Sequence, residues 1–345
     1  MQKPSLGWQS WSPPFPKWHG FPRWDYSPIK ISRKISSPTS KKLFPPIKYW
    51  CSWYAYGWDI NDQKINKTLA VIKKSQLPLT HILIDDGWTT WGDWHTPDLL
   101  RFADFIGLIK KIKSNGLQAG LWFAPFLGNS KSQLFAKHPD WFIQHHGRYL
   151  QGLKTLPIWE WFLPQQYLLN LELPIVKKYL TDFVDLAITE WGVTLLKLDF
   201  LYAPYFDPRH KSDHAPHNQV SWLLQYIKQN YPQVTIIACG APFAPSINIA
   251  DIVRVSKDTA LPPNIPSFLN RFFYNHRVKM LINKLQSPNL PKNLLIDPDV
   301  RIFKLDSTLT QSIWKIVPED VLGIGDNLCK LSEITLNNIK LWLSH

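Results

Sequence analysis

The feature that most constrains the fold of this chain is a repeated alternation of short apolar runs with longer segments of helical pattern, beginning at Ile47. We predict buried strands at 47–53, 80–85, 117–123, 193–199, 234–239, 251–256, 293–297 and 319–324. We predict helices near 62–75, 99–114, 175–190, 217–230, 266–284, 306–315 and 331–343. Near-continuous apolar strands that alternate with helices are typical of a parallel sheet buried on both faces. Eight such strands predict an α/β fold, a (β/α)8 TIM barrel rather than an open sheet.

The composition divides the chain into two parts. Residues 1–46 are dense in Pro, Ser, Trp and Lys and show no sustained period, so we expect an irregular N-terminal segment there. Residues 47–345 are expected to form the barrel. Within the barrel, we expect Asp62 to cap the first helix, Pro97 and Asp98 to precede the second, and Asn115 and Gly116 to end it.

Cysteine usage and charge argue against several classes of protein. Cys51, Cys239 and Cys329 lie far apart without a CxxC pair, which argues against a zinc site and a disulfide framework and predicts a cytoplasmic location. The first 16 residues lack the apolar region of a secretory signal, and no run approaches the roughly 18 apolar residues of a membrane span. The formal charge is +13, but the Lys residues are scattered in short pairs, which does not favour a nucleic-acid partner. We expect no cofactor.

Polar side chains gather where the predicted strands end. They are Asp85 and Asp86, Lys197 and Asp199, Cys239 and Gly240, Arg254 and Asp258, and Asp297 and Asp299. In a barrel the carboxyl ends of the strands meet at one rim, where catalytic groups lie. The chain also has 18 Trp, and Trp50, Trp53, Trp88 and Trp122 fall at the same strand ends, where we interpret them as facing a sugar. Carboxylates, cations and indoles together predict a sugar pocket.

Glycoside hydrolysis requires two carboxyl groups across the scissile bond, and Asp199 and Asp258 are candidates by position. Lys197 lies two residues before Asp199 and should share its face, so we expect Lys197 to keep Asp199 ionised as a nucleophile. Arg254 and Lys257 are expected to modulate the proton affinity of Asp258. Alternatively, one of the two carboxylates is only an ion-pair partner. A metal site is not favoured, because no His lies at ligand spacing with the strand-end aspartates.

In this order, the motifs resemble glycoside hydrolase clan D, most closely the family 36 α-galactosidases (melibiases). The matching segments are WCSWYAYG at 50–57, IDDGW at 84–88, GLWFAPF at 120–126, LLKLDF at 195–200, ACGAP at 238–242, VRVSKDT at 253–259, LLIDPDVRIF at 294–303 and DVLGIGDNLCKL at 320–331. The resemblance implies a retaining exo-α-galactosidase that acts by double displacement on α-galactoside oligosaccharides. It also implies that residues 1–46 are the remnant of a β-sandwich domain, and it leaves a homo-oligomer open.

The resemblance also assigns roles to residues. Asp199 matches the nucleophile and Asp258 the acid/base, while Asp299 matches a residue that supports the pocket floor. The positions that match sugar-binding residues are Trp53, Asp85, Asp86, Trp122, Lys197, Cys239, Gly240 and Arg254. Three alternatives stay open: a galactosyl transferase of the raffinose-synthase type, an α-N-acetylgalactosaminidase, and a carbohydrate-binding barrel without catalysis.

Overall fold

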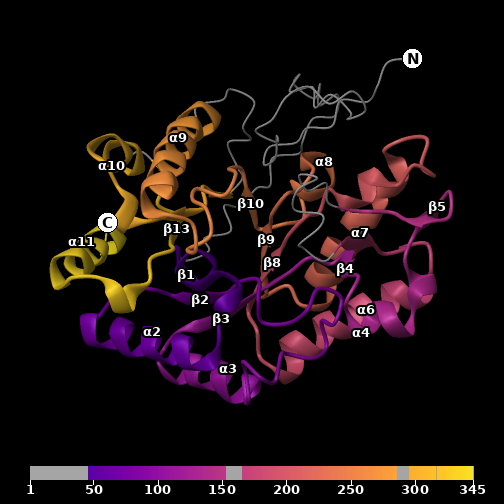
Figure 1. Ribbon diagram of the computed structural model, residues 1–345, viewed down its shortest axis with the longest axis horizontal. Helices are drawn as coiled ribbons and strands as arrows, with labels where there is room; N and C mark the ends of the chain where they lie inside the picture. Colours follow the sequence, from indigo (N-terminus) through magenta and orange to yellow (C-terminus); the bar gives the residue numbers. More distant parts are fainter. Residues whose placement is uncertain (1–45, 153–164, 286–294, 316, 345) are drawn as a thin grey trace.

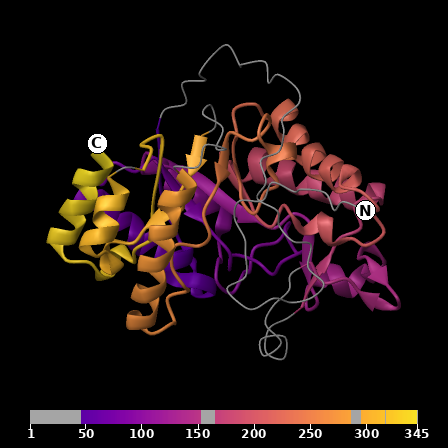
Figure 2. The ribbon, with the colours of Figure 1, turned by 90° about the horizontal axis from the view of Figure 1, so that it is seen from above.

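The computed structural model describes residues 46–152, 165–285, 295–315 and 317–344 (Figure 1). The predicted irregular segment 1–46 therefore lies outside the described residues, apart from Pro46. In Figure 1 the strands lie in the middle, with α2 and α3 below them, α6 and α7 to the right and α9 to α11 to the left. Figure 2, the view from above, shows the same arrangement of helices around the strands. No helix in the described part of the chain is both long and apolar enough to cross a membrane.

The central sheet is parallel throughout, and each predicted strand is found within it. Its neighbours follow the order β11-β10-β9-β8-β3-β2-β1-β13-β12. The strands are β1 (Ile47–Cys51), β2 (His81–Ile84), β3 (Gln118–Phe123), β8 (Leu195–Leu198), β9 (Thr235–Ala238), β10 (Ile252–Arg254), β11 (Leu295–Asp297), β12 (Val300–Arg301) and β13 (Val321–Ile324). Only Pro298 and Asp299 separate β11 from β12, which form the two ends of that order. The two ends of the sheet therefore meet, and the seventh strand is split between them as the sheet curls into a TIM barrel.

The helices match the predicted ranges with small shifts at their ends, except at the start of α3. They are α2 (Asp62–Ser75), α3 (Phe105–Ser114), α6 (Pro174–Asp185), α7 (His214–Asn230), α9 (Ser267–Leu285), α10 (Thr308–Trp314) and α11 (Glu333–Ser344). A π-helical turn, Leu186–Glu190, continues α6 to the predicted end. The region between β3 and α6, where we expected no element, contains α4 (Gln133–Lys137) and short antiparallel pairs. These pairs are β4 (Leu127–Asn129) with β7 (Gln166–Leu168), and β5 (Gln144–His145) with β6 (Arg148–Tyr149).

One predicted helix cap and one predicted helix start are wrong. The N-cap of α2 is Asn61, whose side chain accepts a hydrogen bond from the Lys64 amide, and Asp62 is the first helical residue. The helix predicted from residue 99 begins only at Phe105, because the preceding residue, Asp104, accepts the Gly107 amide as the cap. For α2 the cause is that neighbouring Asn and Asp residues can each cap a helix, and tertiary packing selects between them. The predicted end of α3 at Asn115 and Gly116 is confirmed.

Alternation along each strand divides the core into two layers. Along β8, Leu195 packs with the group that includes Tyr49 of β1, Ile237 of β9 and Ile252 of β10, whereas Leu196 packs with the group beneath the outer helices. The strand residues of the first group fill the barrel interior. Lys197 and Asp199 lie an even number of residues from Leu195 and therefore also point inward. Gly323 of β13 leaves the space that the Tyr49 ring occupies, since a Cβ there would lie 2.5 Å from the ring.

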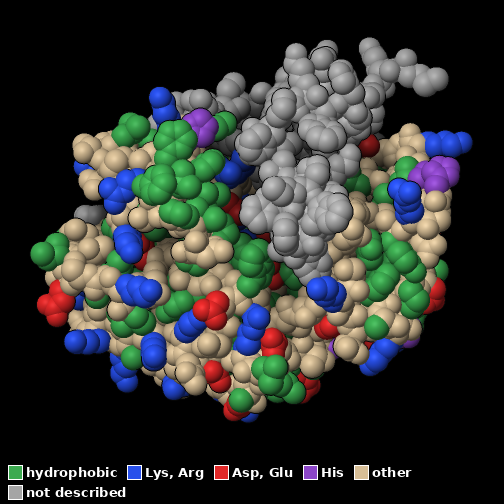
Figure 3. All heavy atoms as spheres, viewed as in Figure 1, with side chains coloured by type: hydrophobic (Ala, Val, Ile, Leu, Met, Phe, Trp, Pro, Cys, Tyr) green, Lys and Arg blue, Asp and Glu red, His purple; other side chains and the backbone are tan. Residues whose placement is uncertain are grey.

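The charged surface agrees with the scattered pattern of the sequence. Figure 3 shows Lys and Arg side chains dispersed over the visible face, with Asp and Glu among them. None of the three cysteines forms a disulfide, and Cys51 and Cys239 are buried.

Candidate active site

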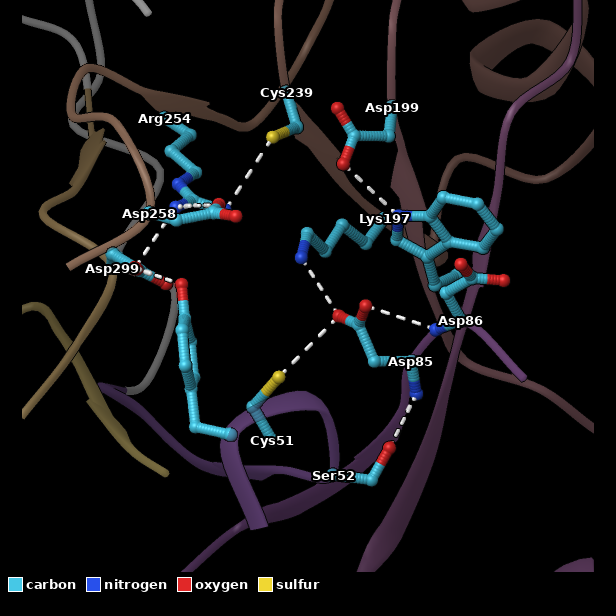
Figure 4. A network of polar contacts seen from close by, with 12 residues as sticks. Cys51, Ser52, Asp85, Asp86, Lys197, Asp199, Cys239, Arg254, Asp258 and Asp299 are labelled. Carbon is cyan, nitrogen blue, oxygen red and sulfur yellow. Dashed lines mark hydrogen bonds and ion pairs between the residues drawn. The ribbon is translucent and has the colours of Figure 1, made fainter. Parts of the chain in front are cut away.

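The strands bring most of the predicted site residues together at one rim of the barrel (Figure 4). Asp85 follows β2 directly, Lys197 lies on β8, Asp199 follows β8, and Arg254 ends β10. Asp258 lies in the loop after β10. The convergence expected from the barrel is therefore present, and each side chain is held by contacts that the sequence did not show.

Asp85, which follows β2, and Lys197 of β8 form a buried ion pair, although β3 lies between these two strands in the sheet. Lys197 Nζ lies 2.7 Å from Asp85 Oδ2, and the two side chains are 7% and 4% exposed. The same oxygen accepts the Cys51 thiol at 3.3 Å, and Asp85 Oδ1 accepts the Asp86 amide at 2.9 Å. Burial is the largest single effect and lowers the pKa of Lys197, but Asp85, Cys51 and Cys239 together outweigh it and hold that pKa above its usual value. Lys197 was expected to act on Asp199, but its ion pair in the structure is with Asp85.

Asp86 is held by two indoles. Trp58 Nε1 donates to Asp86 Oδ2 at 2.6 Å, and Trp91 Nε1 donates to Oδ1 at 2.7 Å. Burial raises the pKa of Asp86 to about 7, and these two hydrogen bonds offset it only in part. A neutral Asp86 could donate a hydrogen bond to a sugar hydroxyl as well as accept one.

Asp199 accepts hydrogen bonds from the side chain of Trp122 and from the main chain of Phe200. Trp122 Nε1 donates to Asp199 Oδ2 at 3.0 Å, and the Phe200 amide donates to Oδ1 at 2.7 Å. Trp122 is paired in register with Lys197, so its ring lies on the inner face beside the strand that ends in Asp199. The arrangement orients the carboxylate through two donors and leaves it half-buried at the rim.

Arg254 forms ion pairs with two carboxylates, those of Asp258 and Asp299. Its Nη2 lies 2.8 Å from Asp258 Oδ1 and 2.9 Å from Asp299 Oδ2, while Nη1 lies 3.7 Å from Cys239 Sγ. Although 52% of the Asp258 side chain is exposed, desolvation by the surrounding protein raises its pKa. Arg254, Lys197 and Arg277 outweigh that effect, so the net shift is downward. The predicted influence of Arg254 on Asp258 is thus present in the geometry.

The predicted sugar-facing tryptophans divide into two groups. Trp50 and Trp88 are fully buried, and their indoles donate to the main-chain oxygens of Asp326 and Trp122, so for these two the prediction is wrong. Trp50 lies at an even position of β1, which faces the outer helices, whereas its neighbour Cys51 faces inward. Trp53 is half-buried against Trp58, and Trp122, although buried, donates to Asp199, so for these two a sugar-facing role stays a prediction.

Sequence reasoning did not identify Tyr54, Trp58 and Trp91 as site residues. Tyr54 donates to Asp299 Oδ2 at 2.5 Å, and Trp58 and Trp91 hold Asp86. Trp58 is 47% exposed, and its ring meets that of Trp53 edge-on, with centroids 5.2 Å apart. The signal was their position in the loops that follow the first two strands, because such loops form the mouth of a barrel.

Gly240 follows β9 beside the Asp199 turn. Its φ is 56°, and a Cβ there would lie 3.2 Å from the Tyr202 ring and 3.3 Å from the Phe200 amide. Only glycine suits this close approach. The described residues contain no group of three or more His, Cys, Asp or Glu arranged to hold a metal ion.

Comparison with known sequences identifies relatives of this chain. A protein-family model described as Melibiase matches residues 32–244, which is more than half of the chain. The protein named probable alpha-galactosidase C of Aspergillus flavus is 27% identical over 218 residues, covering 57% of this chain and 27% of that protein. The alpha-galactosidase of Escherichia coli is 28% identical over 180 residues, covering 49% of this chain and 24% of that protein. The matches span about a quarter of the length of these curated relatives.

Solved structures resemble the chain over a longer stretch. An alpha-galactosidase from Thermus thermophilus in complex with stachyose has a TM-score of 0.70 and 26% identity, covering 86% of this chain and 65% of that one. The GH36 alpha-galactosidase AgaA from Geobacillus stearothermophilus has a TM-score of 0.62 and 17% identity, covering 87% of this chain and 41% of that one, a likeness of fold. With the barrel, the strand-end carboxylates and the family match in agreement, the chain belongs to the melibiase family.

Proposed function

We propose that this chain is a retaining exo-α-galactosidase that releases terminal α-galactosyl residues from oligosaccharides. The observation that carries the proposal is the pair Asp199 and Asp258, which a melibiase-family barrel presents from two elements at one rim. Similar structures were solved with stachyose and with raffinose, and this supports a galactoside substrate.

In the first proposed step, the Asp199 carboxylate attacks the anomeric carbon while Asp258 gives its proton to the leaving oxygen. The bond to the aglycone breaks, and a galactosyl ester of Asp199 forms. In the second step Asp258, now a carboxylate, takes a proton from water as the water attacks the same carbon, and Asp199 leaves. Galactose departs with its anomeric configuration retained.

The contacts around the two carboxylates suit these roles. The Trp122 indole and the Phe200 amide both donate to the Asp199 carboxylate and orient it for attack. Asp258 lies on a loop, half-exposed, where it can reach a leaving group. Since its ion pair with Arg254 favours the carboxylate form, proton donation requires substrate hydroxyls to accept hydrogen bonds from Arg254 and weaken that pair.

The remaining site residues are proposed to hold the sugar. Carboxylates accept from hydroxyls and cations donate to them, while indoles cover the C–H faces. By position, these residues are Asp85, Asp86, Lys197 and Arg254 for the hydroxyls, Trp53 and Trp122 for the ring, and Cys239 with Gly240 beside the 2-substituent.

An aryl α-galactoside assay on the purified chain tests the proposal. Asp199→Asn should abolish turnover, and Asp258→Asn should lower it by about 10²–10⁴-fold for a poor leaving group, the usual contribution of general acid catalysis. The matched control is Asp140→Asn, which changes an exposed aspartate outside the proposed site and should keep full activity. Proton NMR of the first product should show α-galactose. A folded wild-type chain without turnover refutes the activity, and β-galactose as first product refutes retention.

A further inference from the structure

The loop that carries Asp258 is held through its main chain. The carbonyl of Asp258 accepts a hydrogen bond from Arg277 Nη1 at 2.8 Å, and the amide of Thr259 donates to Asp299 Oδ2 at 2.7 Å. These two groups belong to the same peptide unit, which is planar and rigid. Hydrogen bonds at both its ends therefore fix the plane, and with it the direction in which the Asp258 side chain leaves the backbone.

The two partners of this peptide come from separate elements. Arg277 lies on α9, outside the strands, whereas Asp299 lies in the break between β11 and β12. The loop follows this break closely, since Ser256 Oγ donates to the Pro298 carbonyl at 2.9 Å and Thr259 Oγ1 donates to that of Val300 at 2.8 Å. The loop and the strand break thus form one hydrogen-bonded unit, and Arg277 joins it to α9.

Asp299 adopts a backbone conformation that suits this task. Its φ is 74°, in the left-handed region that non-glycine residues rarely adopt. Its Oδ2 accepts from the Tyr54 hydroxyl, the Thr259 hydroxyl and Arg254 as well as from the Thr259 amide. Such a conformation persists when surrounding contacts determine it, and here several donors converge on one carboxylate.

We propose that Arg277 and Asp299 clamp the Asp258–Thr259 peptide and are positioning residues that hold the Asp258 carboxyl in place for proton transfer. The role rests on the proposed function of Asp258. Neither residue is assigned a reacting role: Arg277 acts from the helix through the main chain, and Asp299 acts through Thr259 and Arg254. We call this pair of contacts the peptide clamp.

The charges around Asp258 come from several elements. The charged groups are Arg254 of β10, Lys197 of β8, Arg277 of α9, the Asp299 carboxyl and the adjacent Lys257, which lines a small pocket with Arg277. Tyr54 of α1 (Trp53–Tyr56) adds a neutral titratable group. Arg277 is one of the cations that lower the pKa of Asp258. Its removal should therefore both loosen the peptide and raise that pKa.

The leaving-group dependence of kcat/KM tests the clamp. Arg277→Met should lower kcat/KM about 10-fold for phenyl α-galactoside, the size expected for loss of a charged hydrogen bond. It should change kcat/KM little for 2,4-dinitrophenyl α-galactoside, whose departure needs no proton. Arg277→Lys should recover part of the loss.

The matched control is Arg271→Met on the same helix. Arg271 also donates to a main-chain carbonyl, that of Lys304, and in this variant both substrates should react as in the wild type. An equal loss for both substrates overturns the proposal.

A second measurement does not depend on turnover. Carbon-13 NMR of Asp-labelled full-length chain follows the Asp258 carboxyl, assigned by its absence in Asp258→Asn. Arg277→Met should raise the pKa of Asp258, and Arg271→Met should leave it unchanged. Asp299→Asn, which retains the shape of the side chain, should also shift this titration. A wild type without galactosidase activity refutes the proposed function, whereas an unchanged Asp258 titration in Arg277→Met refutes the clamp.

Discussion

Asp86 and Asp258 lie at the same barrel mouth, and their pKa values move in opposite directions. Asp86 is buried between two neutral indole donors, and its pKa rises to about 7. Asp258 also experiences desolvation, but Arg254, Lys197 and Arg277 lower its pKa below the usual value. The comparison teaches that neutral N–H donors only partly replace the water that a carboxylate loses, whereas nearby cations more than compensate for it.

The largest expected effect comes from removing a cation on the buried side of the site. Lys197→Met leaves the Asp85 carboxylate buried without its ion-pair partner, which should lower the free energy of unfolding by about 3–5 kcal/mol. Urea denaturation measures the change. The control is Lys178→Met on α6, whose pair with Asp182 is exposed and should contribute only about 0.3–0.5 kcal/mol. Adding Asp85→Asn to Lys197→Met should restore part of the loss, and a double variant less stable than Lys197→Met would contradict the ion-pair account.

A smaller effect should follow from removing a neutral donor. Trp122→Phe retains most of the ring but loses the hydrogen bond to Asp199, so kcat/KM for an aryl α-galactoside should fall about 10-fold, equivalent to about 1.4 kcal/mol. Trp222→Phe on α7 is the control, because its half-buried ring lies beneath Lys177. If KM alone rises in Trp122→Phe while kcat is unchanged, the indole serves sugar binding and does not assist the nucleophile.

A third expected effect is a change in how the free energy of unfolding depends on pH. Because the pKa of folded Asp86 is raised from 3.8 to about 7, the folded chain binds more protons than the unfolded chain between these values. This contribution to stability is fully present below about pH 4 and is lost as the pH rises through about 7. Asp86→Asn should remove up to about 1.4 kcal/mol per pH unit from that slope, measured by urea denaturation between pH 4.5 and 7.

Asp258 provides the opposite case for the same measurement. Its lowered pKa adds stability that is present above the unfolded value and is lost as the pH falls through the folded one. Asp258→Asn should therefore change the profile only on the acidic side, and Asp140→Asn should change neither side. Identical slopes in Asp86→Asn and the wild type would contradict the raised pKa of Asp86.

The parts that sequence reasoning predicted well are those governed by local periodicity. Each predicted strand of the barrel is present, and the inward parity of Lys197 and Asp199 follows from the alternation along β8. The same alternation explains why the sugar-facing prediction for Trp50 is wrong. Trp50 was selected by its residue type, but its position in β1 turns the side chain toward the outer helices. Helix caps were less predictable, since Asn61 and Asp62 are chemically similar candidates.

The sequence by itself determined the alternation of strands and helices and the placement of carboxylates at strand ends, because these depend on side-chain period and on the common direction of parallel strands. Only the tertiary structure decided which partner each charge took. Lys197 reaches Asp85 rather than Asp199, and one peptide after β10 is held by α9 and the β11–β12 break. Lys197 and Asp85 are 112 residues apart in the sequence. In the clamp, Asp258 and Arg277 are 19 residues apart, and Thr259 and Asp299 are 40 residues apart. The closure of the barrel brings them within hydrogen-bond distance, and no local pattern encodes that.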